Sequence, residues 1–126
     1  RLLEYRPLLL DDVAYNFPEL KIIVEHVGGR NFYDEAVALM LNNKYVHAGI
    51  SSCLNEETHK VWYLGVERVE EIAALIGEDR MIYGTDFPYN DSKSIAKDIK
   101  TIMNSNLTHS AKEKLLGENL KRILNV

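Results

Sequence analysis

The sequence contains one cysteine, Cys53, among its 126 residues, so no disulfide can form within the chain. This excludes a small secreted module held together by disulfides and favours a reducing compartment, for which we predict the cytoplasm. No apolar run approaches the roughly 20 residues that a membrane-spanning helix requires. Residues 1–10 also lack the apolar stretch and the small-residue cleavage site of a signal peptide. We therefore expect no membrane partner.

Positive charge is also scarce, because 15 Lys and Arg stand against 19 Asp and Glu, for a net charge of −4. Nucleic-acid-binding surfaces and polybasic membrane-binding faces need an excess of positive charge, so neither is supported. The remaining composition is typical of a globular protein, with 46% hydrophobic and 27% charged residues. A chain of this length can bury a core of its own, and we predict one domain over residues 1–126.

The spacing of apolar residues predicts helices that alternate with three short strands. The strands are expected at 21–27, 45–51 and 80–86, where short apolar runs end in turn-forming residues. Helices are expected around them, at 7–17, 31–41, 66–76, 95–103 and 108–124. Strands separated by helices pair in parallel, so we predict an α/β fold in which strand 45–51 is the middle strand.

For three of these helices, the sequence also predicts a buried face or a capping residue. The expected buried face of the first helix consists of Leu10, Val13, Ala14 and Phe17. Asn31 or Asp34 is expected to cap the second helix. Thr108 or Ser110 should cap the last helix, and Ser110 with Glu113 has the spacing of a capping box. The expected buried residues of this last helix are Leu116, Leu120, Ile123 and Leu124.

Polar residues that suit catalysis stand at the carboxyl ends of the predicted strands, where parallel α/β sheets place their sites. His26, Ser51 and Asp86 occupy these three ends. Because side chains alternate along a strand, His26 should share a face with Ile22 and Val24, and Asp86 should share one with Ile82 and Gly84. If both faces point inward, His26 and Asp86 converge, as a divalent metal with an activated water or an acid–base pair requires. The alternative is that both side chains only hydrogen-bond local backbone in turns.

Three segments of the chain resemble, in order, the amidohydrolase superfamily, and in particular the amidohydrolase-2 type that includes relatives of aminocarboxymuconate-semialdehyde decarboxylase. Residues 17–29, ending in His26-Val27-Gly28-Gly29, are similar to the sixth strand of that family. Residues 80–88, with Gly84-Thr85-Asp86-Phe87-Pro88, are similar to its eighth strand, and residues 116–124 resemble its closing helix. The resemblance implies strands six to eight, the C-terminal part, of a (β/α)8 TIM barrel, with three parallel strands and flanking helices.

The same resemblance implies roles for individual residues. Asp86 would ligate a divalent metal, expected to be zinc, and would accept a proton from an attacking water. His26 would lie beside the metal as a proton shuttle or electrostatic partner, or would bind a second metal. Gly28 and Gly29 would let the loop pass close to the substrate. Apart from the resemblance, Arg30 is a candidate for binding an anionic substrate group, with an ordinary surface arginine as the alternative.

The chain departs from the family at its metal ligands and in its length. The paired histidines of the first strand and the histidine of the fifth have no counterpart, because no His-x-His occurs in the sequence. A complete barrel typically needs about 250 residues, roughly twice this length. Open strand edges and an uncovered inward face, with Ile22, Val24 and Ile82, would then drive association. We expect either a homo-oligomer or association with the missing barrel portion.

The remaining histidines and the serines that follow the middle strand fit structural roles. His47 lies in mid-strand and is predicted to be a packing residue, whereas His59 and His109 are predicted to face solvent. Ser51 and Ser52 are predicted to form hydrogen bonds within a loop, because the spacing implies no adjacent base that would make either a nucleophile.

The resemblance implies a metal-dependent hydrolase of the amidohydrolase type that acts on a small carboxylated or cyclic molecule through a metal-activated water. One alternative is a nonoxidative decarboxylase of the same family, since the motifs do not fix the reaction type. A second alternative is a non-catalytic half-barrel. A nucleotide-binding βαβ domain is disfavoured, because no Gly-x-Gly-x-x-Gly follows a predicted strand.

Overall fold

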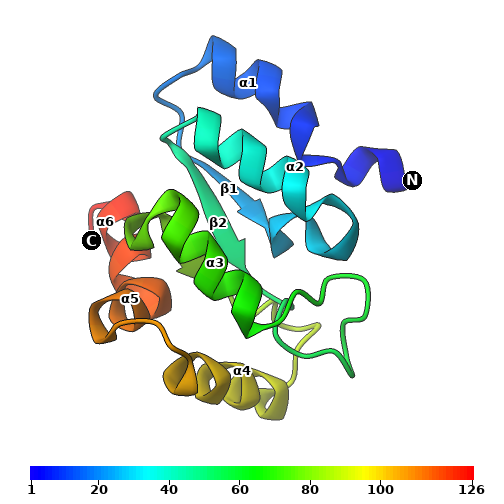
Figure 1. Cartoon of the computed structure of the whole chain (residues 1–126), viewed down its shortest axis with the longest axis vertical. Coiled ribbons are helices and arrows are strands. Elements are labelled where there is room, and N and C mark those ends of the chain that lie inside the picture. The colour runs from blue at the N-terminus through cyan, green and yellow to red at the C-terminus, as the bar shows by residue number, and fades with distance from the viewer.

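The structure is a computed structural model that describes residues 1–126, and at its centre lies a three-stranded parallel sheet (Figure 1). The strands are β1 (Ile22–Glu25), β2 (Val46–Ile50) and β3 (Met81–Tyr83), and β2 lies between the other two. Each strand is shorter than the apolar run that predicted it. The predicted parallel pairing and the predicted strand order are both confirmed.

The helices follow the strands in the expected alternation. They are α1 (Asp11–Asn16), α2 (Gly29–Asn42), α3 (Val66–Ile76), α4 (Ser92–Asn104), α5 (His109–Glu113) and α6 (Asn119–Leu124). Short 3-10 turns precede α1, follow β1 and precede β3. None of these helices combines the length and the apolar character needed to cross a lipid bilayer.

One face of the sheet is covered by α2 and α3, which lie in front of it in Figure 1. Val24, Ala48, Ile50 and Met81 point from the strands into this layer, and all are buried. They pack against apolar side chains of the two helices, namely Ala36, Leu39 and Met40 of α2 and Val69, Ile72 and Ile76 of α3. Burial of these side chains is the main stabilising contribution to the fold.

The prediction that Ile22 and Val24 point inward together with Ile82 is wrong. Ile22 pairs with Val46 and packs against the same core as Val24, on the face that the helices cover. Ile82 lies opposite Gly49 and outside that core. Alternation along paired strands therefore places Ile82 on the other face, which it shares with Glu25 rather than with Val24.

The expected buried face of α1 and the expected cap of α2 also need correction. Of the four apolar residues expected to be buried in the first helix, only Ala14 is buried, whereas Phe17 is 62% exposed. The second helix begins at Gly29 behind Gly28, which has a left-handed backbone with a φ of 72°, so neither Asn31 nor Asp34 caps it. Glycine tolerates this conformation, which lets the helix start directly after the 3-10 turn that follows β1.

The C-terminal segment is two short helices rather than one. Thr108 caps α5 by accepting a hydrogen bond from the Ala111 amide, while Ser110 donates instead to Glu78, so the predicted capping box is wrong. A π turn over Lys114–Glu118 separates α5 from α6. This turn rotates the buried face, which consists of Ala111, Leu115 and Asn119 instead of the four residues expected.

Candidate active site at the carboxyl end of the sheet

Backbone strain gathers where the chain leaves the three strands. Five non-glycine residues have positive φ, and four of them, His26, Val27, Ser52 and Asp86, follow a strand within a few residues. Their φ values lie between 46° and 59°, in the left-handed region that side chains with a Cβ disfavour. Strain of this kind costs about 1–3 kcal/mol for each residue and is concentrated at functional sites. The carboxyl edge of the sheet is therefore the candidate site.

His26 is held in one orientation by a backbone carbonyl and an indole ring. Its Nδ1 lies 2.9 Å from the Ser51 carbonyl oxygen, which can only accept, so Nδ1 carries the proton. The imidazole stacks on Trp62 with 4.8 Å between the ring centroids. In the neutral ring the lone pair of Nε2 is left available for a metal ion or a proton. Metal-binding histidines are commonly oriented by this kind of N–H to carbonyl contact.

Glu25 belongs to the site, although no sequence motif predicts a role for it. Its carboxylate accepts a hydrogen bond of 2.6 Å from the Ser51 hydroxyl. It also covers Gly49, since a Cβ added there would lie 2.7 Å from the carboxyl carbon. The register of β1 and β2 sets Glu25 opposite a glycine and leaves room for a long side chain, and this register is known only from the structure. Glu25 and His26 together border a hollow of about 230 Å³ that also touches Tyr5 and Trp62.

Both the side chain and the main chain of Asp86 are held by hydrogen bonds near the carboxyl end of β2. Its Oδ2 accepts a hydrogen bond of 2.6 Å from Ser52, and its backbone carbonyl accepts from the amides of Tyr89 and Asn90. Asn90 is 2% exposed and donates from its side chain to both Ser52 and the Thr85 carbonyl. Oδ1 of Asp86 accepts no hydrogen bond within the chain, so it remains free.

His26 and Asp86 thus flank the end of β2, because their contacts are to Ser51 and Ser52, which are consecutive in the chain. The prediction that both open onto the carboxyl end, on either side of the middle strand, agrees with this geometry. The reason is not side-chain alternation, which the left-handed residues interrupt. Both serines form loop hydrogen bonds, as predicted.

The prediction that His59 faces solvent is wrong. Its ring is half-buried, and Nε2 forms a short hydrogen bond with the Asn90 side-chain oxygen. The nearby carboxylate of Asp98 is buried, and burial raises the pKa of this group. Oδ1 of Asp98 is the one buried side-chain oxygen or nitrogen in the chain without a hydrogen-bond partner. No local sequence pattern indicates this contact, because His59 lies in the polar connection between β2 and α3.

The other predicted roles are mostly confirmed. His47 is 6% exposed and bonds the Tyr45 carbonyl, and burial lowers the pKa of its imidazole, as fits a packing residue. His109 is exposed beside Glu113 on α5. Gly28 and Gly29 do permit a close approach, but it is to neighbouring protein: a Cβ on Gly29 would lie 2.8 Å from the ring of Trp62.

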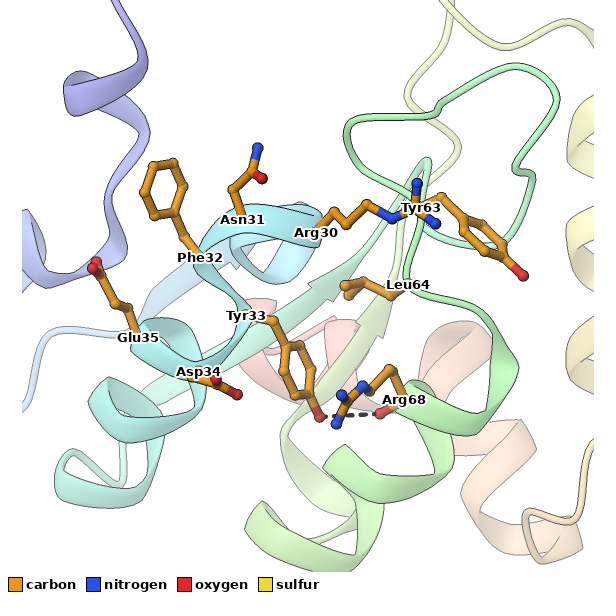
Figure 2. Close-up of a pocket in the computed structure, with 9 residues that line it drawn as sticks. All are labelled: Arg30, Asn31, Phe32, Tyr33, Asp34, Glu35, Tyr63, Leu64 and Arg68. Carbon is orange, nitrogen blue, oxygen red and sulfur yellow. Dashed lines mark hydrogen bonds between the residues drawn. The ribbon is translucent and has the colours of Figure 1, made fainter.

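Arg30 does not join His26 and Asp86. Its guanidinium pairs with Glu56 at 3.4 Å and lies over the ring of Tyr63. It lines a separate hollow of about 490 Å³. Figure 2 shows the Arg30 side chain extending towards Tyr63, and Arg68 beside Tyr33. Both arginines therefore already have carboxylate and aromatic partners, since Arg68 pairs with Glu71. A substrate contact for Arg30 stays a prediction.

The donor atoms suit a divalent cation but do not complete a site. A free carboxylate oxygen on Asp86 and an available imidazole nitrogen on His26 are ligand types that zinc and manganese accept. The chain contains no group of three or more His, Cys, Asp or Glu side chains placed to hold a metal ion. A catalytic zinc typically has about three protein ligands. Any metal held at this edge would therefore need further ligands.

Solved structures with the same fold include metal-containing enzymes. A dihydroxybenzoic acid decarboxylase from Polaromonas sp. JS666, with bound manganese and the inhibitor 2-nitroresorcinol, is 18% identical with a TM-score of 0.63, covering 98% of this chain and 39% of that one. An amidohydrolase from Burkholderia multivorans with bound zinc is 15% identical with a TM-score of 0.65, covering 93% and 48%. A 5-carboxyvanillate decarboxylase from Sphingomonas paucimobilis is 15% identical with a TM-score of 0.65, covering 94% and 38%.

The chain thus spans less than half the length of these solved structures. The likeness confirms the predicted fold, part of a (β/α)8 barrel with three parallel strands and flanking helices. Among curated proteins, no sequence matches the chain. The amidohydrolase family model Amidohydro_2 matches residues 3–126, which is nearly the whole chain. The chain therefore belongs to the amidohydrolase family.

Proposed function

We propose that this chain supplies part of the active site of a metal-dependent hydrolase that acts on a small carboxylated or cyclic molecule. The observation that carries the proposal is the pairing of His26 and Asp86 across the end of β2, each with one polar atom fixed and one free. Family membership supports it. The manganese and zinc bound in two structural neighbours support a divalent metal, and we propose zinc.

The residues of this chain would have separate roles in the reaction. Oδ1 of Asp86 would hold the cation and take a proton from water, while Ser52 keeps Oδ2 occupied. The lone pair of His26 Nε2 would accept or return a proton at the substrate, because Nδ1–H is fixed on the Ser51 carbonyl. A bound divalent cation would supply Lewis-acid polarisation and a lowered pKa for its water. We also propose Arg30, which lines the separate hollow beside Tyr63, as a contact for an anionic group of the substrate.

Nonoxidative decarboxylation is the second candidate reaction. Two of the similar solved structures are a dihydroxybenzoic acid decarboxylase and a 5-carboxyvanillate decarboxylase. The same pair of residues would serve it, with His26 or Asp86 delivering a proton to the ring carbon in place of activating water. Assays of candidate substrates for release of carbon dioxide, against assays for ring or amide opening, separate the two reactions.

The small number of donors leads to a proposal about partners. Asp86, even if His26 joined it as a second ligand, falls short of a typical site, so the remaining ligands would come from the missing barrel portion or from a second copy of this chain. The competing hypothesis is that the chain by itself is a non-catalytic half-barrel. We propose a cytoplasmic location, which suits the buried free thiol of Cys53.

The test compares variants of the full-length product of the gene, and the chain alone, for zinc content and turnover. Asp86→Ala should abolish turnover and lower zinc content, because it removes both the ligand and the proton acceptor. Asp91→Ala is the matched control, since Asp91 is a carboxylate of the same turn region that only caps α4. Near-normal turnover of Asp86→Ala would exclude the proposed role of this residue.

A further inference from the structure

We propose that His59, Asn90 and Ser52 are positioning residues that form a directed hydrogen-bond chain onto Asp86 and leave Oδ1 as its reactive oxygen. This proposal rests on the proposed function of Asp86, but the direction of the chain is a property of the protein alone. The three residues lie in separate segments: Ser52 two residues after the end of β2, His59 in the loop before α3, and Asn90 in the turn before α4.

The donor-to-acceptor direction of the hydrogen-bond chain follows from the Thr85 carbonyl. This oxygen can only accept, and the Asn90 side chain contacts it at 2.9 Å, so the contacting atom is the amide nitrogen. The same nitrogen lies 3.2 Å from the Ser52 hydroxyl oxygen, to which it donates. Ser52 therefore has its single proton free for Asp86, and it donates this proton to Oδ2 at 2.6 Å.

The orientation of Asn90 also fixes the proton on His59. With the amide nitrogen turned to Thr85, the Asn90 oxygen faces Nε2 of His59. An oxygen at this contact requires that Nε2 carry a proton, in either the neutral Nε2–H tautomer or the charged ring. Every link then runs the same way, from His59 to Asn90, to Ser52 and to Asp86. Hydrogen bonds aligned in one direction strengthen each other.

Asn90 holds the main chain of Asp86 as well as its side chain. Its backbone amide donates to the Asp86 carbonyl at 3.2 Å, and Asp86 keeps a φ of 54°. Ser52 has the same φ, also 54°. The two residues that meet in the 2.6 Å hydrogen bond are thus both in a strained conformation, which the surrounding contacts must maintain. A packing role alone would not require polar atoms in this alignment.

The first experiment tests the direction of the hydrogen-bond chain in the metal-free protein. Long-range proton–nitrogen NMR correlations should show that His59 carries its proton on Nε2, and that this signature changes in Asn90→Ala. A neutral His59 with its proton on Nδ1 would overturn the proposed direction. This measurement does not depend on metal binding, so it stands or fails separately from the proposed function.

The second experiment measures zinc affinity and turnover in the full-length product of the gene. Ser52→Ala and Asn90→Ala should lower zinc affinity by roughly 10- to 100-fold, as loss of a residue that orients a metal ligand does. Turnover should fall with little change in KM. Asn119→Ala is the matched control, because Asn119 is also 2% exposed but contacts only two carbonyls near β3 and the Arg122 guanidinium, away from Asp86. That control should lower stability and leave zinc affinity unchanged.

Rescue by a conservative variant separates positioning from packing at His59. His59→Gln keeps an N–H donor near the position of Nε2 and should retain most of the zinc affinity, whereas His59→Phe keeps the ring and should not. Folded Ser52→Ala protein with unchanged zinc affinity would refute the positioning role. If Asp86→Ala itself leaves zinc affinity unchanged, the proposed function fails instead, and the NMR result decides the hydrogen-bond direction alone.

Discussion

At the ends of the strands, His26 and Asp86 each use one polar atom on a neighbour and keep another free. A carbonyl fixes the His26 ring, and a serine hydroxyl fixes the Asp86 carboxylate. Residue chemistry alone identifies both as candidates, yet it does not say which atom is free. That depends on Ser51 and Ser52, whose positions follow from the turn after β2.

Asp98 gives a prediction about pH. Burial raises the pKa of this carboxyl above its unfolded value, so the folded state favours the protonated form. Its contribution to stability is fully present below the unfolded pKa and is lost as the pH rises through the folded pKa. Asp98→Asn removes the buried charge and should stabilise the protein at neutral pH by about 1 kcal/mol.

The measurement is the free energy of unfolding from urea titrations of both proteins at about pH 4 and about pH 7. The advantage of Asp98→Asn should grow between these two values. Asp91→Asn is the control, because the hydrogen bond from the Ser94 amide lowers the pKa of the exposed Asp91 carboxyl. An advantage of Asp98→Asn that is the same at both pH values would contradict the prediction.

Gly29 gives a prediction about close packing beside His26. It has a φ of 58°, and an added Cβ would lie 2.9 Å from the backbone oxygen of Val61 and 2.8 Å from the ring of Trp62. Gly29→Ala should therefore add a steric clash to the backbone strain of about 1–2 kcal/mol and displace Trp62 from His26.

Gly77→Ala provides the comparison, because Gly77 has a φ of 88° with nothing within 4 Å of the added Cβ. Thermal or urea unfolding should show a larger loss for Gly29→Ala, and Trp62 fluorescence should change in that variant alone. Equal losses would mean that the loop moves aside at no cost.

At the scale of elements, a few side chains join strands to helices by donating hydrogen bonds to main-chain carbonyls of several elements. Arg80 is the main example, since its guanidinium donates to carbonyls at the end of α2, at the start of β2 and at the end of α3. Positive charge at helix C-termini is favourable because carbonyls without helical partners gather there. Asn119 acts similarly at β3, where it donates to the Met81 carbonyl.

Arg80→Met should destabilise the fold by about 2–4 kcal/mol, because it keeps the aliphatic stem but leaves these carbonyls without a charged donor. Arg80→Lys should lose less, since one ammonium can satisfy part of the set. The free energy of unfolding from urea titration measures both. A loss below about 0.5 kcal/mol for Arg80→Met, as for ordinary surface substitutions, would show that water replaces the guanidinium.

On the scale of the whole molecule, exposed apolar side chains are concentrated in the N-terminal segment rather than on the face of the sheet. Leu2, Leu3, Leu9 and Tyr15 are each at least 62% exposed, and the same segment borders β1, which has a strand neighbour on one side only. A surface of this kind, next to an open strand edge, favours association. The face predicted from Ile22 and Val24 cannot be that surface, because the helices cover it.

We expect the isolated chain to self-associate through this N-terminal segment. Sedimentation velocity should show a weight-average mass that rises with concentration, and Leu3→Glu with Leu9→Glu should shift the chain towards monomer. Leu124→Glu is the control, since Leu124 is 59% exposed but lies in α6. A wild-type chain that stays monomeric at every concentration would contradict this expectation.

The sequence by itself determined the α/β alternation, the parallel sheet and the position of His26 and Asp86 at strand ends. Apolar period and turn residues are local signals, and the rule that strands joined by helices pair in parallel needs no coordinates. Helix α3 matches its predicted range of 66–76 for the same reason: a clear apolar period is bounded by Gly65 and Gly77. The motifs around His26 and Asp86 likewise carried the family resemblance without any structure.

Tertiary structure alone decided which face each side chain takes and which partners it finds. Alternation along β1 places Glu25, rather than Val24, towards the site, and left-handed residues after the strands then interrupt the alternation that would have paired His26 with Val24. His59 and Asn90 are 31 residues apart, and no local pattern links them before the turns after β2 and β3 bring them into contact. Such contacts depend on backbone turns and on packing between distant segments, which a one-dimensional pattern does not encode.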